Sequence, residues 1–219
     1  MNSTVVSAGV HHQLVALVAT ELRHPLVPIR NAAALLRHES LDAATIRRAA
    51  EIIERQVSGM NRLIGDLLEV SRLQMGSLEL RPVRTSLSDL MRRVVESAGP
   101  VASERGQELL VTLSPEPVYL DMDLTRVAQA LHNIIGNTSK HGHIRVRAHR
   151  EDMQAVFVVS YQGLGSGEPE PGVGLGLYLA RYLLEAHSGT VTVESSAAGL
   201  ISIITVRLPC ELPTALRDG

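Results

Sequence analysis

The sequence predicts a two-part fold, in which a helical hairpin that forms a dimeric four-helix bundle is followed by an α/β sandwich. Three observations lead to this prediction. Apolar residues recur at three- and four-residue spacing through residues 13–74, as in amphipathic helices. From Gly76 onward, short strand-like runs alternate with helical ones. The 219 residues, 45% of them hydrophobic, are enough for one large domain or two small ones with a buried core.

The first helix of the hairpin is expected over Gln13–Leu36, where Pro25 and Pro28 interrupt the helical repeat. Proline removes a backbone hydrogen bond and bends the helix axis, so the pattern predicts a kinked helix. A short loop then leads to a second helix over Ala43–Gln74. Its apolar residues form a stripe close to a heptad repeat: Ile46, Ala50, Ile53, Val57, Met60, Ile64, Leu67 and Val70 or Ser71.

A two-helix hairpin has only two layers, and it leaves this apolar stripe open. The stripe is buried most readily against a second copy of the hairpin, which predicts a homodimer. Packing of the stripe against the rest of the same chain is the alternative that the sequence leaves open.

The boundary between the two domains is expected at Gly76 and Ser77, which gives one domain over residues 1–75 and a second over 76–219. In the second domain, the mixture of elements indicates one helical layer over one mixed sheet. Its expected helices are Ser86–Ser97, Asp123–Asn137 and Gly174–His187. Its expected strands are Leu78–Val83, Glu108–Leu113, Val118–Leu120, His143–His149, Met153–Ser160, and a terminal hairpin of Thr190–Ser195 and Ile201–Leu208.

Composition argues against several classes of function. With 21 basic and 23 acidic residues, the net charge of −2 gives no global positive field for nucleic acid or an anionic membrane. A single cysteine, Cys210, excludes an internal disulfide and a multi-cysteine metal site. The chain has no membrane-spanning apolar run, and Met1–Gly9 lacks the regions of a signal peptide. We therefore expect a soluble, cytoplasmic protein that binds neither nucleic acid nor membrane.

Two glycine clusters in the second domain indicate a phosphate-binding backbone. One follows a strand and the other opens a helix, and their glycines are Gly163, Gly165, Gly172, Gly174 and Gly176. Glycine lets the backbone approach a ligand closely, and free N–H groups at a helix start can bind phosphate oxygens. Taken alone, a glycine-rich turn is equally consistent with an ordinary loop.

The helix expected at 123–137 adds polar side chains to this picture. Asn133 and Asn137 are four residues apart on one helical face, and Lys140 and His141 follow one turn later. Carboxamide oxygens suit Mg²⁺ held between protein and phosphates, and Lys140 can neutralise phosphate charge. Without the glycine clusters, surface positions or helix caps would explain the two asparagines better.

Together these motifs resemble the catalytic core of sensor histidine kinases, over about residues 13–209. Glu21-Leu22-Arg23-His24-Pro25-Leu26 matches the H-box of the dimerisation and phosphotransfer hairpin. The second glycine box is Gly172–Leu177, and Leu184–Thr190 is similar to the segment that follows that box in the family. The N-box is recognisable in Asp123, Arg126, Gln129, Asn133, Asn137, Lys140 and His141.

The resemblance implies a dimeric four-helix bundle followed by a histidine-kinase-type ATPase sandwich, of the kind shared with gyrase and heat-shock chaperones. It also implies ATP and Mg²⁺ as cofactors, with Asn137 as the Mg²⁺ ligand, and a response regulator or another histidine kinase as partner.

The H-box departs from the family pattern at its central position. The phosphorylated histidine of the family stands directly before the acidic residue, here Glu21, and this chain has Thr20 in that place. Imidazole is a neutral nucleophile near pH 7, whereas a threonine hydroxyl needs an adjacent base. Autophosphorylation at the usual position is therefore predicted to be lost. His24 is the alternative acceptor, although a shift of roughly 5–6 Å along the helix disturbs in-line transfer.

The nucleotide-binding motifs depart from the family pattern as well. The family's first glycine box begins with an aspartate that accepts a hydrogen bond from the adenine amino group, and this chain has Tyr161 there. A phenol cannot reproduce a buried carboxylate, and its bulk is expected to fill the base pocket. Only residues 166–171 separate Gly165 from Gly172, where the family has a long lid. Any binding of ATP and Mg²⁺ is therefore expected to be weak or absent.

The favoured interpretation is a degenerate histidine-kinase-like protein, a dimeric scaffold or regulator of two-component signalling that has lost autokinase activity. The alternative is an active phosphotransferase or phosphatase of a phosphorelay that uses His24 and binds ATP weakly. A serine kinase of the anti-sigma type is a third interpretation, which the long hairpin and the missing aspartate weaken. We recognise no sensor region and expect the input signal to come from another polypeptide or from expression level.

Overall fold

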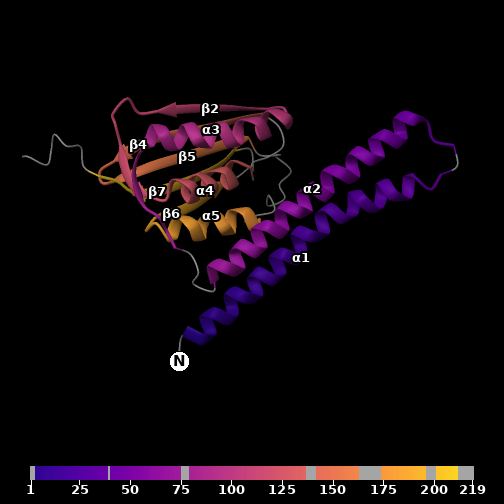
Figure 1. Cartoon of the computed structure of the whole chain (residues 1–219), viewed down its shortest axis with the longest axis horizontal. Coiled ribbons are helices and arrows are strands. Elements are labelled where there is room, and N and C mark those ends of the chain that lie inside the picture. Colours follow the sequence, from indigo (N-terminus) through magenta and orange to yellow (C-terminus); the bar gives the residue numbers. More distant parts are fainter. Residues whose placement is uncertain are drawn as a thin grey trace, which may run out of the picture. The chain divides into compact units, whose positions relative to one another are not determined.

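The structure of the chain, a computed structural model, describes residues 3–38, 40–74, 79–136, 142–162, 174–195 and 201–211. The chain divides into two compact units, Met1–Leu78 and Glu79–Gly219 (Figure 1). The first unit is helical, and the second contains both helices and strands.

The first unit is a hairpin of two long helices, α1 (Ser3–Leu35) and α2 (Ala43–Gln74), which pack along each other. α1 begins well before the predicted Gln13 and runs through Pro25 and Pro28 as one helix. Pro25 is buried, so we attribute the continuity of the helix to packing, which offsets the lost backbone hydrogen bonds. α2 begins after Asp42, whose carboxylate accepts the Thr45 N–H at 2.6 Å.

The buried core of the hairpin is narrow. Its buried apolar residues are Leu14, Ala32, Ala49, Val70 and Leu73. The predicted stripe of α2 is only partly covered, since Ile46, Val57 and Ile64 remain 47%, 45% and 47% exposed in the single chain. The hairpin alone therefore leaves much of its apolar surface open.

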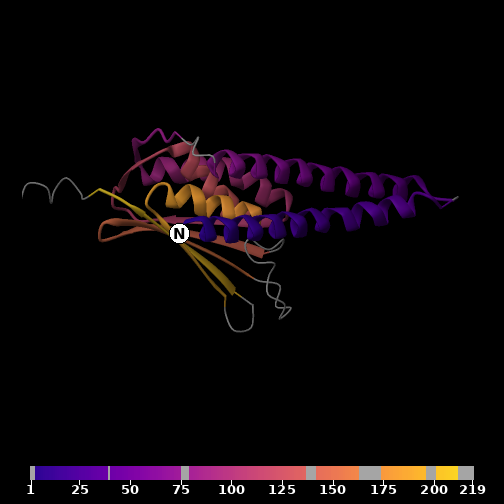
Figure 2. The same cartoon turned by 90° about the horizontal axis from the view of Figure 1, so that it is seen from below.

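The second unit contains a five-stranded sheet in the order β2-β4-β5-β7-β6. β2 pairs with β4 in parallel and the other neighbours are antiparallel. The strands are β2 (Gln107–Leu113), β4 (Gly142–Glu151), β5 (Gln154–Gln162), β6 (Thr190–Ser195) and β7 (Ile201–Pro209). The helices α3 (Leu87–Glu104), α4 (Leu124–Gly136) and α5 (Leu175–Glu185) cover one face of this sheet (Figure 2). The predicted α/β sandwich with a mixed sheet is confirmed.

The strand register places alternate residues in the core. Ala148 lies opposite Phe157, which in turn lies opposite Val206, and all three are buried. Burying a large apolar side chain contributes on the order of 1.5–3 kcal/mol before entropy is subtracted. The apolar residues that alternate along these strands therefore lie on the face of the sheet that the helices cover.

The strand predicted at Leu78–Val83 is wrong. The ladder begins only at β1 (Val83–Ser86), which pairs with β3 (Tyr119–Met122) in a second, two-stranded sheet. Pro82 has no N–H to give to a ladder, so the strand begins after it.

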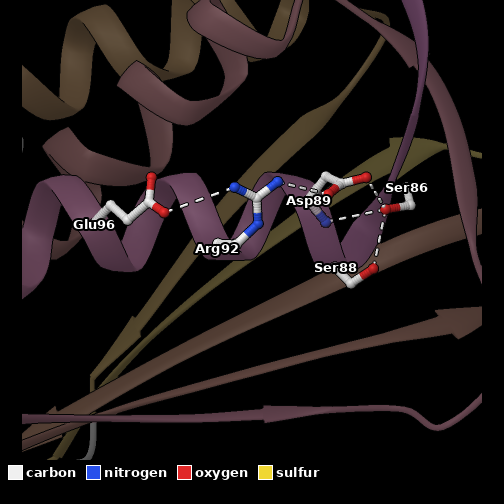
Figure 3. A network of polar contacts seen from close by, with 5 residues as sticks. All are labelled: Ser86, Ser88, Asp89, Arg92 and Glu96. Atoms are coloured by element: carbon white, nitrogen blue, oxygen red, sulfur yellow. Dashed lines mark hydrogen bonds and ion pairs between the residues drawn. The ribbon is translucent and has the colours of Figure 1, made fainter.

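The predicted end of α3 at Ser97 is also wrong, because the helix continues through Pro100 to Glu104. Ala98 and Ala102 are buried, so packing holds this last part of the helix. At the other end, Ser86 caps the helix: its Oγ accepts the Asp89 N–H at 3.0 Å and contacts the Asp89 carboxylate at 2.7 Å (Figure 3).

Among the described residues, none of the helices combines the length and the apolar character that a membrane span requires.

Candidate functional site

The start of α4 is fixed by the Asp123 carboxylate. It accepts the N–H groups of Thr125 and Arg126 at 3.1 and 3.2 Å, as a helix cap does, and the Arg81 N–H at 3.1 Å. Burial alone raises the pKa of Asp123, but the three N–H donors and the charge of Arg126 outweigh it, so the pKa lies below its ordinary value. α4 thus begins at a firmly held, ionised carboxylate.

His187, just after the end of α5, contacts the residue at the start of α4. The Nδ1 of His187 is 2.7 Å from the Leu183 carbonyl oxygen, and its Nε2 is 3.1 Å from the Asp123 backbone nitrogen. The carbonyl can only accept and the amide can only donate, so Nδ1 donates to the Leu183 carbonyl and Nε2 accepts from the Asp123 N–H. His187 therefore connects the end of α5 to the start of α4.

Further along α4, the Asn133 side chain faces the start of α5. A Cβ placed on Gly176 would lie 3.8 Å from the Asn133 Cβ and 3.9 Å from its Cγ. The Asn133 Nδ2 is buried and has no hydrogen-bond partner among the residues that the structure describes. An unused buried donor is costly, so this amide is suited to a ligand acceptor.

The start of α5 offers backbone donors beside that amide. Gly174 caps the helix without a side-chain hydrogen bond, and its carbonyl accepts from Leu177 and Tyr178. The first N–H groups of any helix have no partner within the helix and carry partial positive charge. The Asn133 amide and this helix start together fit an anionic ligand such as phosphate.

The remaining predicted nucleotide-site residues are only partly described. Tyr161 is the last residue but one of β5, lies opposite Ile144 and Ser202, and is 8% exposed. It lies on the same sheet face as the buried Phe157 and Val159, beneath the helices. Asn137, Lys140, His141, Gly163, Gly165 and Gly172 lie outside the described residues.

The H-box residues lie on α1 in the other unit. Thr20 is exposed, and its hydroxyl donates to the Ala16 carbonyl at 3.0 Å, one turn earlier. Glu21 is half-buried and His24 is exposed. The threonine proton is thus held by the backbone of its own helix.

The sequence analysis missed one polar residue, Arg105, which follows α3 and contacts the last residue of α4. The Nη1 of Arg105 donates to the carbonyl of Gly136, the last residue of α4, at 2.8 Å. The two residues are 31 positions apart, so no local spacing signal connects them.

No cluster of three or more histidine, cysteine, aspartate or glutamate side chains able to hold a metal ion occurs in the described part of the chain.

Comparison with known families agrees with this architecture. Residues 11–76 match the His Kinase A (phospho-acceptor) domain, and residues 122–212 match the histidine kinase-, DNA gyrase B- and HSP90-like ATPase. A phosphoacceptor-type hairpin followed by an ATPase of this class defines the catalytic core of a two-component kinase. The chain belongs to the histidine kinase family.

Individual relatives support this assignment. The sensor histidine kinase MtrB of Mycobacterium tuberculosis (strain H37Rv) is 38% identical over 157 residues, which are 69% of this chain and 28% of MtrB. The chain therefore spans less than a third of the length of this relative.

Two solved structures share the fold. Histidine kinase ThkA in complex with the response regulator protein TrrA gives a TM-score of 0.65 at 20% identity, covering 94% of this chain and 64% of that chain. Full-length ShkA in complex with AMPPNP gives 0.60 at 25% identity, covering 92% and 46%.

Proposed function

We propose that this chain is a pseudokinase of two-component signalling, a dimeric scaffold or regulator that binds a response regulator or a partner kinase. Residues 1–75 would form the dimerisation hairpin and residues 76–219 an ATPase-like domain. The observation that carries the proposal is Thr20 at the acceptor position, with its hydroxyl bonded to the Ala16 carbonyl.

The chemistry of Thr20 supports the loss of autokinase activity. A hydroxyl attacks phosphorus only when a base removes its proton. The Thr20 hydroxyl instead donates its proton to a backbone carbonyl, which is not a base. The neighbouring acid, Glu21, lies on the same helix, and it makes no hydrogen bond to Thr20 in the described part of the chain. Without an imidazole at this position, phosphoryl transfer lacks its nucleophile.

We propose that the chain still binds nucleotide, but with low affinity. The amide of Asn133 and the N–H groups at the start of α5 would hold phosphate oxygens, and Asn137 would share Mg²⁺ with them. Bound ATP supplies the phosphoryl group in related kinases, and Mg²⁺ neutralises its charge. The buried Tyr161 supports weak binding, because its ring takes space where the family has a carboxylate for adenine.

Homodimerisation is supported by the open apolar surface of the hairpin. Ile46, Val57 and Ile64 on α2 are about half exposed, and Leu26 and Val27 on α1 are 50% and 44% exposed. Such a run of large apolar side chains is unusual on a free surface. A second copy of the hairpin supplies a complementary face by symmetry.

We also place the protein in the cytoplasm, where ATP and receiver domains occur. The lone cysteine, Cys210, is buried and unpaired with another cysteine, which suits a reducing compartment.

The second candidate function is phosphotransfer through His24. The observation in its favour is that His24 is exposed on α1, one helical turn from Thr20. An exposed imidazole near the usual acceptor position can meet a phosphoryl group carried by a receiver domain.

One experiment separates the two functions. The full chain and a His24→Ala variant are incubated with receiver domains carrying labelled phosphoryl groups. The scaffold predicts that both proteins bind a receiver and that neither acquires label. Label on the wild-type chain that is absent from His24→Ala would establish phosphotransfer and overturn the scaffold.

A further inference from the structure

β2 is an edge strand whose outer side is unprotected. It pairs with β4 on one side, and no described strand lies beyond it (Figure 1). In the described part of the chain, the backbone of residues 108–113 makes no hydrogen bond outside the ladder with β4. Edge strands are usually protected by lysine, proline or a bulge, and residues 108–113 contain neither lysine nor proline. This edge therefore presents backbone donors and acceptors to a further strand.

Two arginines of β4 stand beside this edge, on the sheet face that the helices leave open. Arg145 and Arg147 alternate with Ile144, Val146 and Ala148, which are buried on the helical side of the sheet. Both arginines are exposed. Neither guanidinium forms an ion pair or a hydrogen bond within the part of the chain that the structure describes. Their positive charges are therefore not neutralised by the described residues.

The strand register explains why these two charges have no partner. The neighbours of the arginines on β2 and β5 are uncharged: Leu110 and Ser160 beside Arg145, and Thr112 and Val158 beside Arg147. The carboxylate of Glu108 contacts the neighbouring His143 at 2.9 Å instead. In the row of Arg145, the next acidic residue is Glu194 on β6, three strands away. The described sheet thus offers the two guanidinium groups no carboxylate.

The spacing of the two arginines fits an extended chain. Residues two apart on a strand point to the same side, about 7 Å from each other. A partner segment in the same conformation repeats its side chains at that spacing, so acidic residues at alternate positions match both arginines. A segment paired with β2 lies roughly 10 Å from β4, which the long side chains of glutamate and arginine bridge above β2. Arginine binds carboxylates through two parallel hydrogen bonds.

Nucleic acid and a second copy of the chain fit this surface less well. Single-stranded nucleic acid is bound by aromatic side chains on which bases stack, and none of the described neighbours of the two arginines is aromatic. Phe157 and Tyr161 lie on the helical side of the sheet. A second copy paired through β2 would bring only the carboxylate of Glu108, which already contacts His143. A different, acidic protein segment is the better match.

We propose that the outer edge of β2, with Arg145 and Arg147 beside it, is a docking site for an extended acidic segment of a partner protein. The segment adds a strand to β2 through backbone hydrogen bonds, and its carboxylates at alternate positions contact the two arginines. The site is built from β2 and β4 and includes no part of α4 or α5, so it does not depend on nucleotide binding.

The test uses the full chain and the fluorescence anisotropy of a labelled peptide that alternates glutamate with threonine. We expect saturable binding that weakens as salt is added, because the arginines are exposed and screened by ions. A peptide of the same composition with its glutamates grouped at one end should bind several-fold more weakly. The alternating peptide with N-methylated amides along one edge cannot donate to β2, and it should bind about tenfold more weakly.

Two double variants locate the site. Arg145→Ala with Arg147→Ala should lower the affinity for the alternating peptide by about tenfold. Arg93→Ala with Arg181→Ala is the matched control, because it removes the same charge from exposed positions on α3 and α5. The control should bind as the wild type does. If the first variant does not fold, as judged by circular dichroism, Arg145→Gln with Arg147→Gln takes its place.

Several results would overturn the proposal. Unchanged binding without Arg145 and Arg147 would mean that these arginines only keep the sheet face soluble. An equal loss in both double variants would show a general effect of net charge, and equal binding of the alternating, grouped and N-methylated peptides would show attraction without strand addition. A single-stranded oligonucleotide that binds more tightly than the peptide, through the same arginines, would assign the surface to nucleic acid. Absence of binding by any of the peptides also overturns the proposal.

Discussion

At the scale of single residues, two substitutions separate this chain from the usual chemistry of its family. Thr20 stands where the acceptor histidine is expected, and its hydroxyl is bonded to Ala16. Tyr161 stands where the family pattern has the aspartate for adenine, and it is buried beneath the helices. The two positions lie in different units, so restoring one leaves the other unchanged.

We therefore expect that Thr20→His does not restore autophosphorylation. The variant supplies a nucleophile, but transfer also requires ATP held in line with it and shielded from water. A misplacement of about 1 Å can cost on the order of a hundredfold in rate. The measurement is incubation with labelled ATP and Mg²⁺, followed by a test for acid-labile label. Strong labelling that disappears when Asn137 is also changed to alanine would show a competent nucleotide site.

Asp123 gives a prediction about pH. Its pKa is lowered in the folded protein, so its stabilising contribution is complete above the unfolded pKa, roughly 4, and is lost as pH falls through the folded value. Asp123→Ala removes the helix cap and should cost about 1 kcal/mol at pH 7. Asp123→Asn keeps a capping side chain without the titration.

Urea unfolding at several pH values measures this effect. The difference in stability between the wild type and Asp123→Asn should shrink as the pH falls below about 4. A difference that stays constant from pH 7 to pH 3 would mean that the ionised carboxylate contributes nothing.

At the scale of elements, α3 shows how local interactions of unequal strength combine. Ser86 caps the helix, Arg92 contacts Asp89 at 2.7 Å, and Glu96 lies 3.7 Å from Arg92 (Figure 3). The hydrogen bond from Arg92, and then that from Ser86, lower the pKa of Asp89. The ion pairs are exposed and screened by water, whereas the cap satisfies a backbone donor of the helix start.

Ser86→Ala should accordingly destabilise the protein by about 1 kcal/mol, whereas Glu96→Ala should have a much smaller effect. Chemical denaturation of the two variants and the wild type provides the comparison. Equal losses in the two variants would show that the exposed ion pair is as important as the cap.

The elements also show what sequence patterns can and cannot predict. Alternation and helical spacing predicted a mixed sheet with one helical layer, because burial of one face imposes those periods. They did not predict that β1 and β3 form a separate two-stranded sheet. They missed the continuation of α3 through Pro100, because its packing on other elements outweighs the local preference of proline. The motifs assigned Asn133 and Gly176 to one nucleotide site, and the structure brings these two residues together. The contacts of Arg105 and His187 are tertiary, and sequence spacing does not predict them.

At the scale of the whole molecule, the prediction concerns assembly. Val57→Asp and Ile64→Asp each place a charge on the open apolar stripe of α2 and should convert the proposed dimer to a monomer at micromolar concentration. Arg55→Ala, an exposed change off the stripe, should leave the dimer intact. Light scattering gives the mass of each protein. A monomeric wild type at these concentrations would show that the stripe is not a dimer interface.

The central claim is that this histidine kinase core no longer transfers phosphate from ATP to itself. The most direct measurement is incubation of the wild-type full chain with labelled ATP and Mg²⁺, with acid-labile and acid-stable label measured separately. We predict no label on the chain, because the described residues give Thr20 a backbone carbonyl rather than a base as its hydrogen-bond partner, and because the buried Tyr161 replaces the carboxylate that we expect adenine binding to need. Acid-labile label that is lost in His24→Ala would contradict the claim and identify an active kinase with a shifted acceptor.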